Sequence, residues 1–299
     1  MLIQLIRRTV HGFLLPESSR SKRQKDHEGT RHECVKTRTG GSVEVVTWDK
    51  NRNTNLKERK LWIYIHGRSC SASQSFEWDD GRPDIMTTLA QYGTVYGVNL
   101  PGYENSTLTD NDITNAEFDT YAAAMSLKTF FNWKAEELGI QPDDIAIVSV
   151  SVGAFLASQL MLEMLGVRSV YITPLANLAK VKYGYLPSWL VSRTVKAASL
   201  TGRTHREFPE YDSVGFDTVR VLEAALPTGN PTTEDLVVFQ AEDDEIMPKD
   251  SARQIVNAAG RGRIAELDDK NGHRSKLSEK ELREICESWS WKLEDTLPT

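Results

Sequence analysis

Ser151 stands where a chain can present a nucleophile. Asp144 to Val150 form a run of mostly β-branched apolar residues, the sequence then passes through Ser-Val-Gly, and an apolar helical stretch follows from Ala154 to Leu165. This order predicts a strand, a sharp turn and a buried helix, with Ser151 at the apex. At such a turn a serine hydroxyl projects above the sheet, close to the free amides of the helix N-terminus. The chemistry that this arrangement could support is nucleophilic attack by the serine oxygen.

The motif around this serine is Ser149-x-Ser151-x-Gly153. It differs at one residue from the Gly-x-Ser-x-Gly nucleophile elbow. Both flanking positions must be small, because the strand and helix backbones pass close together there, and Ser149 is small enough to replace glycine. An ordinary buried strand-to-helix turn is the alternative interpretation of the motif taken alone.

An acidic loop and a histidine follow later in the chain, each just past a predicted strand. The strand at 235–240 runs into the loop Glu242-Asp243-Asp244-Glu245, and the strand at 264–267 leads to Asn271-Gly272-His273. A histidine can take the proton of a serine hydroxyl, and a carboxylate can orient that histidine. The residue types for nucleophilic catalysis are therefore present, in the order serine, acid, histidine.

Two earlier segments have the same form, a predicted strand that ends in a glycine-containing loop. Residues 61–65 precede His66-Gly67-Arg68-Ser69, and residues 92–99 precede a loop that begins Leu100-Pro101-Gly102. With the serine, acid and histidine, this pattern resembles the α/β-hydrolase family from about His32 to the C-terminus. Three residues depart from the family pattern, Ser149, Arg68 and Glu104. At Ser149 and Glu104 relatives often have glycine.

The resemblance implies a role for each member of the set. Ser151 would be the nucleophile, His273 the general base, and Asp244 the acid that holds the imidazole in the correct tautomer. Asp243 is the close competitor of Asp244. We favour Asp244 because Asp-Glu-Ile-Met-Pro, which it begins, resembles the Asp-x-x-Val-Pro ending of the family.

The resemblance also implies an oxyanion hole built from backbone amides. Its two donors would be the N–H groups of Val152 and Arg68, with Ser69 as the alternative to Arg68. We expect His66 to brace this loop and not to exchange protons.

The elements that must position these residues alternate along the chain as strands and helices. This alternation predicts an α/β fold with a mainly parallel central sheet and helices on both faces, as in α/β-hydrolases. The segments 32–37 and 42–48 predict an antiparallel hairpin at the sheet edge. Predicted helices begin at Pro83 and in the capping box at 114–117, span Ala252 to Ala259 before Gly260, and follow the capping box at 278–281.

The chain divides into an N-terminal arm with a flexible basic linker, residues 1–30, and one hydrolase domain, residues 31–299. A segment at about 176–234 is longer than a crossover helix needs, and we expect it to form a small cap. Its Tyr183, Tyr185 and Trp189 would line a substrate pocket, or alternatively fill the core of the cap itself.

Composition narrows the class of protein. The 299 residues carry a formal net charge of −6, which speaks against a nucleic-acid partner. Three scattered cysteines favour a reducing cytoplasm. The histidines outside the motifs lack metal-ligand spacing and the acidic loop lacks the pattern of a calcium loop, so we expect no metal and no cofactor.

The first ten residues are apolar and then basic. A secretory signal has its positive charges before the apolar stretch, whereas in this arm they follow it, so the pattern is not typical of a secretory signal. The arm could make a weak contact with a membrane surface, or it could pack on the domain.

These observations predict a serine hydrolase that cleaves a carboxylic ester or thioester of a small molecule through an acyl-enzyme. Two alternatives stay open. One is an acyltransferase with the same triad, and the other is a non-catalytic binding protein that keeps the fold.

Overall fold

The computed structural model describes residues 30–48, 60–67, 72, 85–101, 106, 116–164, 166–177, 217–225, 236–244 and 246–291. The predicted N-terminal arm lies outside these residues. So do Pro83, the capping box at 114–117 except for its last two residues, and the substrate-pocket candidates Tyr183, Tyr185 and Trp189. The division into an arm and a domain therefore stays a prediction.

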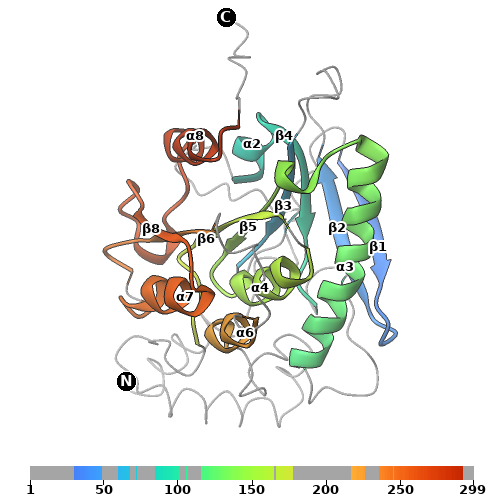
Figure 1. The fold of residues 1–299 in the computed structure, drawn as a ribbon, viewed down its shortest axis with the longest axis horizontal. Helices are drawn as coiled ribbons and strands as arrows, with labels where there is room; N and C mark the ends of the chain where they lie inside the picture. Colours follow the sequence, from blue (N-terminus) through green and yellow to red (C-terminus); the bar gives the residue numbers. More distant parts are fainter. Residues whose placement is uncertain are drawn as a thin grey trace, which may run out of the picture.

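An eight-stranded sheet forms the centre of the molecule, with the strand order β1-β2-β4-β3-β5-β6-β7-β8 (Figure 1). Its strands are β1 (Arg31–Lys36), β2 (Ser42–Trp48), β3 (Lys60–Ile65), β4 (Gly93–Val98), β5 (Ile145–Val150), β6 (Arg168–Ile172), β7 (Leu236–Gln240) and β8 (Arg263–Glu266). β1 pairs with β2, and β2 with β4, in antiparallel register. The pairs from β4 to β8 are all parallel, so the predicted edge hairpin and mainly parallel sheet are confirmed.

Helices cover both faces of this sheet. On one face lie α3 (Ala116–Leu138), α4 (Gly153–Glu163), α6 (Thr218–Ala225) and α7 (Ser251–Ala259), and on the other lie α2 (Ile85–Leu89) and α8 (Glu279–Ser288) (Figure 1). β5 shows why both faces need cover. Its Ile145 and Ile147 belong to the core beneath α4, whereas Ala146 and Val148 belong to the core beneath α8. A strand buried on both faces is apolar throughout, as in parallel sheets generally.

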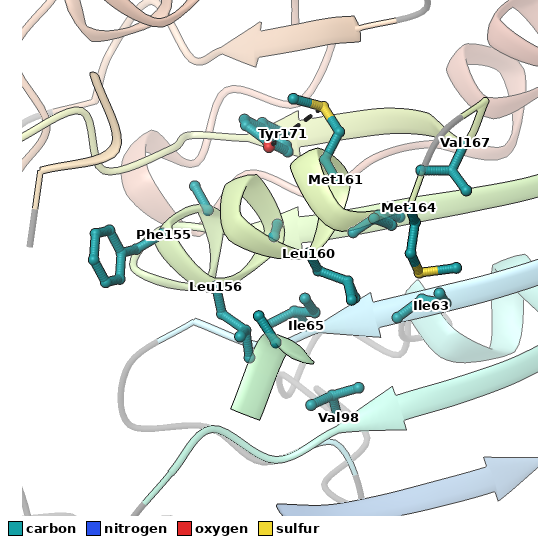
Figure 2. Close-up of a cluster of buried hydrophobic side chains, with 14 of the residues drawn as sticks. Ile63, Ile65, Val98, Phe155, Leu156, Leu160, Met161, Met164, Val167 and Tyr171 are labelled. Atoms are coloured by element: carbon teal, nitrogen blue, oxygen red, sulfur yellow. Dashed lines mark hydrogen bonds between the residues drawn. The ribbon is translucent and has the colours of Figure 1, made fainter. Parts of the chain in front are cut away.

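The helix that follows Ser151 is anchored by its own apolar residues. α4 directs Leu156 and Leu160 toward β3, where Ile63 and Ile65 lie beneath the helix (Figure 2). All four side chains are fully buried. Burying a large aliphatic side chain contributes about 1.5 to 3 kcal/mol, so this packing fixes the start of the helix, and with it the turn at Ser151.

Local signals at two other helices are confirmed. α7 ends at Gly260, whose φ of +72° is the left-handed conformation that closes many helices. α8 begins with a complete capping box, in which the Ser278 side chain accepts from the Glu281 N–H while the Glu281 side chain accepts from the Ser278 N–H.

Only part of the predicted cap segment is described. Within it, α6 packs against α4 and α7, as a crossover helix between β6 and β7 does. The remainder of the predicted cap, from 178 to 216 and from 226 to 234, lies outside the described residues. In the part of the chain that the structure describes, no helix is both long and apolar enough to cross a membrane.

Candidate active site

Ser151 occupies the turn between β5 and α4 with a φ of +52°. This left-handed conformation is uncommon for any residue other than glycine and costs on the order of 1 to 3 kcal/mol. Two backbone hydrogen bonds hold it in place. The Ser151 N–H donates to the Ile172 carbonyl at 3.0 Å, and the Leu175 N–H donates to the Ser151 carbonyl at 2.9 Å. The strained turn is therefore supported by the end of β6 and the loop that follows it.

The glycine after the turn has a steric reason. A Cβ at Gly153 would lie 2.6 Å from the His66 carbonyl oxygen and 2.8 Å from that of Ile65, closer than real Cβ contacts come. The start of α4 therefore passes directly over the end of β3. Gly67 fits closely as well, since a Cβ there would lie 3.2 Å from the Cβ of Ser151. The His66-Gly67 turn thus lies beside the serine.

Ser149, the departure from glycine in the motif, is accommodated inside the sheet. It pairs with Ile65 of β3 and Tyr171 of β6, and its side chain is fully buried. Among the described residues its Oγ has no hydrogen-bond partner. The described contacts therefore give the Ser149 hydroxyl no hydrogen-bonding role.

The structure brings the serine, the histidine and one aspartate together. The Ser151 Oγ lies 2.9 Å from the His273 Nε2, and the His273 Nδ1 lies 3.0 Å from an Asp244 carboxyl oxygen. The three residues follow β5, β8 and β7, so they meet at the carboxyl edge of the parallel strands. The imidazole bridges the other two side chains, which is the arrangement of a catalytic triad.

Asp244 is held so that one carboxyl oxygen faces the histidine. Its Oδ1 accepts from the N–H groups of Ile246 and Met247, each at 2.9 Å, and its Oδ2 faces His273. The side chain is almost entirely buried. An ionised carboxylate only accepts hydrogen bonds, so the His273 Nδ1 must carry the proton, and Nε2 is left to accept from Ser151.

Asp243 has a different partner from its neighbour. Its Oδ1 accepts from the Gly272 N–H at 3.0 Å, which fixes the turn that carries His273. The structure therefore separates the two acids that the sequence left in competition. Asp244 contacts the imidazole, whereas Asp243 contacts the backbone beside it.

Val152 lies at the start of α4, where the first helical amides have no partner within the helix. No acceptor for the Val152 N–H occurs among the described residues. Its amide is placed next to Ser151, as an oxyanion donor would be. Arg68 and Ser69, the candidates for the second donor, lie outside the described residues.

His66 is fully buried and hydrogen-bonded through both ring nitrogens. The Leu100 N–H donates to Nε2 at 3.1 Å, so the ring proton is on Nδ1, which lies 2.6 Å from the Gly67 carbonyl oxygen. Burial lowers the pKa of His66 from 6.5 to about 4. The ring is therefore neutral at pH 7 and links the loop after β3 to the loop after β4, in agreement with a bracing role.

This buried imidazole predicts a loss of stability in mild acid. Between pH 6.5 and 4 the unfolded chain binds a proton at His66 that the folded chain does not, so falling pH favours unfolding, by roughly 3 kcal/mol over that window. In urea titrations at pH 7 and pH 4.5, His66→Gln should show a smaller drop of the unfolding midpoint than the wild type. Glutamine keeps an acceptor for the Leu100 N–H but does not titrate. Equal drops of the unfolding midpoint in both proteins would contradict the lowered pKa of His66.

Thr173, which sequence reasoning did not single out, repeats the backbone conformation of Ser151 one strand away. It follows β6, has a φ of +42° and is fully buried, and its N–H donates to the Phe239 carbonyl at 2.8 Å. A positive φ is exceptional for a β-branched residue, so no sequence rule points to this position. The turns that follow β5 and β6, two neighbouring strands of the sheet, are therefore both conformationally strained.

The described residues include no group of three histidine, cysteine or acidic side chains arranged to hold a metal ion. The described site offers a serine hydroxyl, an imidazole, a carboxylate and the Val152 N–H.

Comparison with known proteins agrees with this geometry. The sequence model of the Alpha/beta hydrolase family matches residues 62–274, well over half of the chain and all three residues of the hydrogen-bonded set. No curated protein matches the sequence.

Among solved structures, a Pyrococcus furiosus esterase superposes with a TM-score of 0.58 at 12% identity, covering 87% of this chain and 91% of that one. Acetyl xylan esterase 1 from a Thermoanaerobacterium species gives 0.57 at 14% identity, covering 92% and 87%. An esterase from a Rhodococcus species gives 0.54 at 13%, covering 88% and 98%. At these identities the likeness shows the fold. Taken with the match of the family model, it shows that this chain belongs to the alpha/beta hydrolase family and is a hydrolase.

Proposed function

We propose that this protein is a serine hydrolase that cleaves a carboxylic ester or thioester through an acyl-enzyme intermediate. The observation that carries the proposal is the position of His273 between Ser151 and Asp244, with hydrogen-bond distances of 2.9 and 3.0 Å. Membership of the alpha/beta hydrolase family supports it. Several of the structures with the same fold are esterases, which supports an ester as the substrate.

In the first half of the reaction, the His273 Nε2 takes the hydroxyl proton as the Ser151 Oγ attacks the carbonyl carbon of the substrate. The carbonyl oxygen becomes an oxyanion, which accepts hydrogen bonds from the N–H groups of Val152 and Arg68. The imidazolium is stabilised by Asp244. It then gives its proton to the leaving oxygen or sulfur, the bond to that atom breaks, and the acyl group stays on Ser151.

In the second half of the reaction, a water molecule releases the acyl group from Ser151 by a parallel series of steps. His273 takes a proton from the water, whose oxygen attacks the acyl carbon, and the oxyanion forms again against the same amides. As the new intermediate collapses, the proton passes to the Ser151 Oγ. The products are the free acid and an enzyme restored to its starting state.

The substrate in this proposal is a small acyl ester or thioester. The protein would have no nucleic-acid partner and would act in the cytoplasm. The apolar residues Tyr183, Tyr185 and Trp189 of the cap segment would line the acyl pocket. The N-terminal arm would provide at most a weak contact with a membrane surface. Each of these statements rests on the sequence alone.

Labelling with a fluorophosphonate probe tests the proposal directly, because the probe phosphonylates a serine, with release of fluoride, only when a neighbouring base activates it. The folded protein should gain one adduct, which peptide fragmentation should place on Ser151. Heat-unfolded protein should gain none. The matched control is Ser149→Ala, which removes the neighbouring buried hydroxyl and should label as fast as the wild type. Absence of labelling in a folded protein would support the non-catalytic binding protein instead.

A further inference from the structure

Asn99, at the carboxyl end of β4, is fully buried and uses both ends of its side-chain amide. Its Oδ1 accepts from the Ala72 N–H at 2.7 Å, and its Nδ2 donates to the Glu44 Oε2 at 2.8 Å. A backbone amide can only donate and a carboxylate can only accept, so these two partners fix the orientation of the amide group.

Glu44, on β2, is itself buried and bound on its second oxygen. Its exposed fraction is 3%, and its Oε1 lies 2.9 Å from the Nδ1 of His32 on β1. A buried carboxyl group is costly unless it is paired and hydrogen-bonded, as this one is. The pair of Glu44 and Asn99 is therefore a fully satisfied polar connection inside an apolar sheet.

The backbone at Asn99 is secured as well. The Asn99 N–H donates to the Glu44 carbonyl at 3.0 Å. The Ser106 Oγ accepts from the Glu44 N–H at 2.9 Å and donates to the Asn99 carbonyl at 2.8 Å. Asn99 is thus fixed to β2 through its main chain and its side chain.

The residue pair 99–100 reaches both ends of one short segment. The Leu100 N–H donates to the His66 Nε2, and the Asn99 Oδ1 accepts from the Ala72 N–H. The chain enters this segment at His66-Gly67, beside Ser151, and returns at Ala72. Two hydrogen bonds from neighbouring residues therefore hold the two described ends of the segment whose sequence includes Arg68, the predicted second oxyanion donor.

We infer that Asn99, oriented by Glu44, is a positioning residue for the oxyanion hole of this enzyme. The inference rests on the proposed function. An oxyanion donor acts only within a few tenths of an ångström of its working place, so the groups that anchor its loop control the stabilisation of the transition state. The described contacts of Asn99 include none with the triad, and its effect passes through the Ala72 N–H.

Ser106 offers a matched control within the same network. It binds Glu44 and Asn99 through backbone atoms only and makes no described contact with the segment 66–72. If the network merely stabilises the fold, removing Ser106 and removing the Asn99 amide should affect activity alike. If Asn99 positions the oxyanion hole, only the second change should reduce kcat.

The test is steady-state hydrolysis of p-nitrophenyl acetate. Asn99→Ala should lower kcat by about 100-fold with KM within a factor of two, because a misplaced oxyanion donor costs as much as the lower end of the loss seen when a donor is removed. Inhibition by phenylboronic acid, whose adduct with the serine is tetrahedral, should weaken by a similar factor. Ser106→Ala should keep kcat within a factor of three of the wild type, although its thermal midpoint falls.

Variants of Glu44 keep the inference testable if Asn99→Ala does not fold. Glu44→Ala frees the Asn99 Nδ2 without touching the segment 66–72, and should lower kcat by about tenfold. Glu44→Gln retains an acceptor for that Nδ2 and should restore kcat to within a factor of two of the wild type. Such rescue is not expected of a change that acts through global stability.

Three results would overturn the inference: an unchanged kcat in folded Asn99→Ala, a rise of KM alone, or an equal loss of kcat in Ser106→Ala. These results are distinct from failure of the proposed function. In that case the wild type itself would neither hydrolyse esters nor label with the fluorophosphonate probe.

Discussion

Ser151→Ala should abolish ester hydrolysis while leaving the fold intact. The change removes the one oxygen atom that attacks the substrate and keeps the Cβ that the tight turn already accommodates beside Gly67. Loss of a triad nucleophile typically lowers kcat by about 10⁴ to 10⁶. Initial rates with p-nitrophenyl acetate, set against the uncatalysed reaction, measure the loss.

The control for this variant is Ser149→Ala, two residues earlier on β5. Its hydroxyl is buried without a described partner, so its removal should change kcat by less than about threefold. Circular dichroism and thermal midpoints should be close to the wild type for both variants. If folded Ser151→Ala keeps more than a tenth of the activity, another residue is the nucleophile.

Much of the fold was readable from the sequence because local and global signals agree in the central sheet. The run at β5 is apolar on both faces, which is what a strand covered by α4 and α8 requires. The end of α7 and the start of α8 carry the residues that such boundaries favour, Gly260 and the pair Ser278 and Glu281. Periodicity and caps are properties of short windows, so one sequence suffices to detect them.

The site was partly readable for a related reason. Ser151, Asp244 and His273 each follow a predicted strand, and the carboxyl ends of parallel strands share one edge. The sequence could place the acidic loop at this edge but not decide between its neighbouring acids by geometry. That decision depends on which carboxyl group reaches the imidazole: Asp244 does, whereas Asp243 binds the Gly272 N–H.

The network around Asn99 could not be read in this way. Glu44, Asn99 and Ala72 are far apart in the chain, and no motif joins a glutamate on an early strand to an asparagine that ends a later one. The register of β2 against β4, which brings Val45 opposite Val98, places Glu44 beside Asn99, and the Ala72 N–H reaches Asn99 from a segment outside both strands. The strain at Thr173 could not be predicted from the sequence either, because a positive φ is not expected at a β-branched residue.

Asp244→Asn should disable His273 as the general base, because it moves the ring proton from Nδ1 to Nε2. In the wild type the Ile246 and Met247 N–H groups both bind the Asp244 Oδ1. In the variant these two donors hold the amide oxygen of the new asparagine, so its NH₂ group faces the His273 Nδ1. That nitrogen must then accept a hydrogen bond, which moves the ring proton to Nε2 and leaves no acceptor for the Ser151 hydroxyl. The same substitution in a serine protease lowers kcat by about 10⁴.

Asp243→Asn is the matched control for this prediction, since it makes the same chemical change one residue away. Its side chain binds the Gly272 N–H, and an asparagine oxygen can still accept that bond. We expect a kcat within about fivefold of the wild type. Initial rates for the two variants, with folding checked by circular dichroism, decide between the acids. Equal losses would mean that the turn carrying His273 depends on both carboxylates, and a larger loss in Asp243→Asn would transfer the role of the triad acid to Asp243.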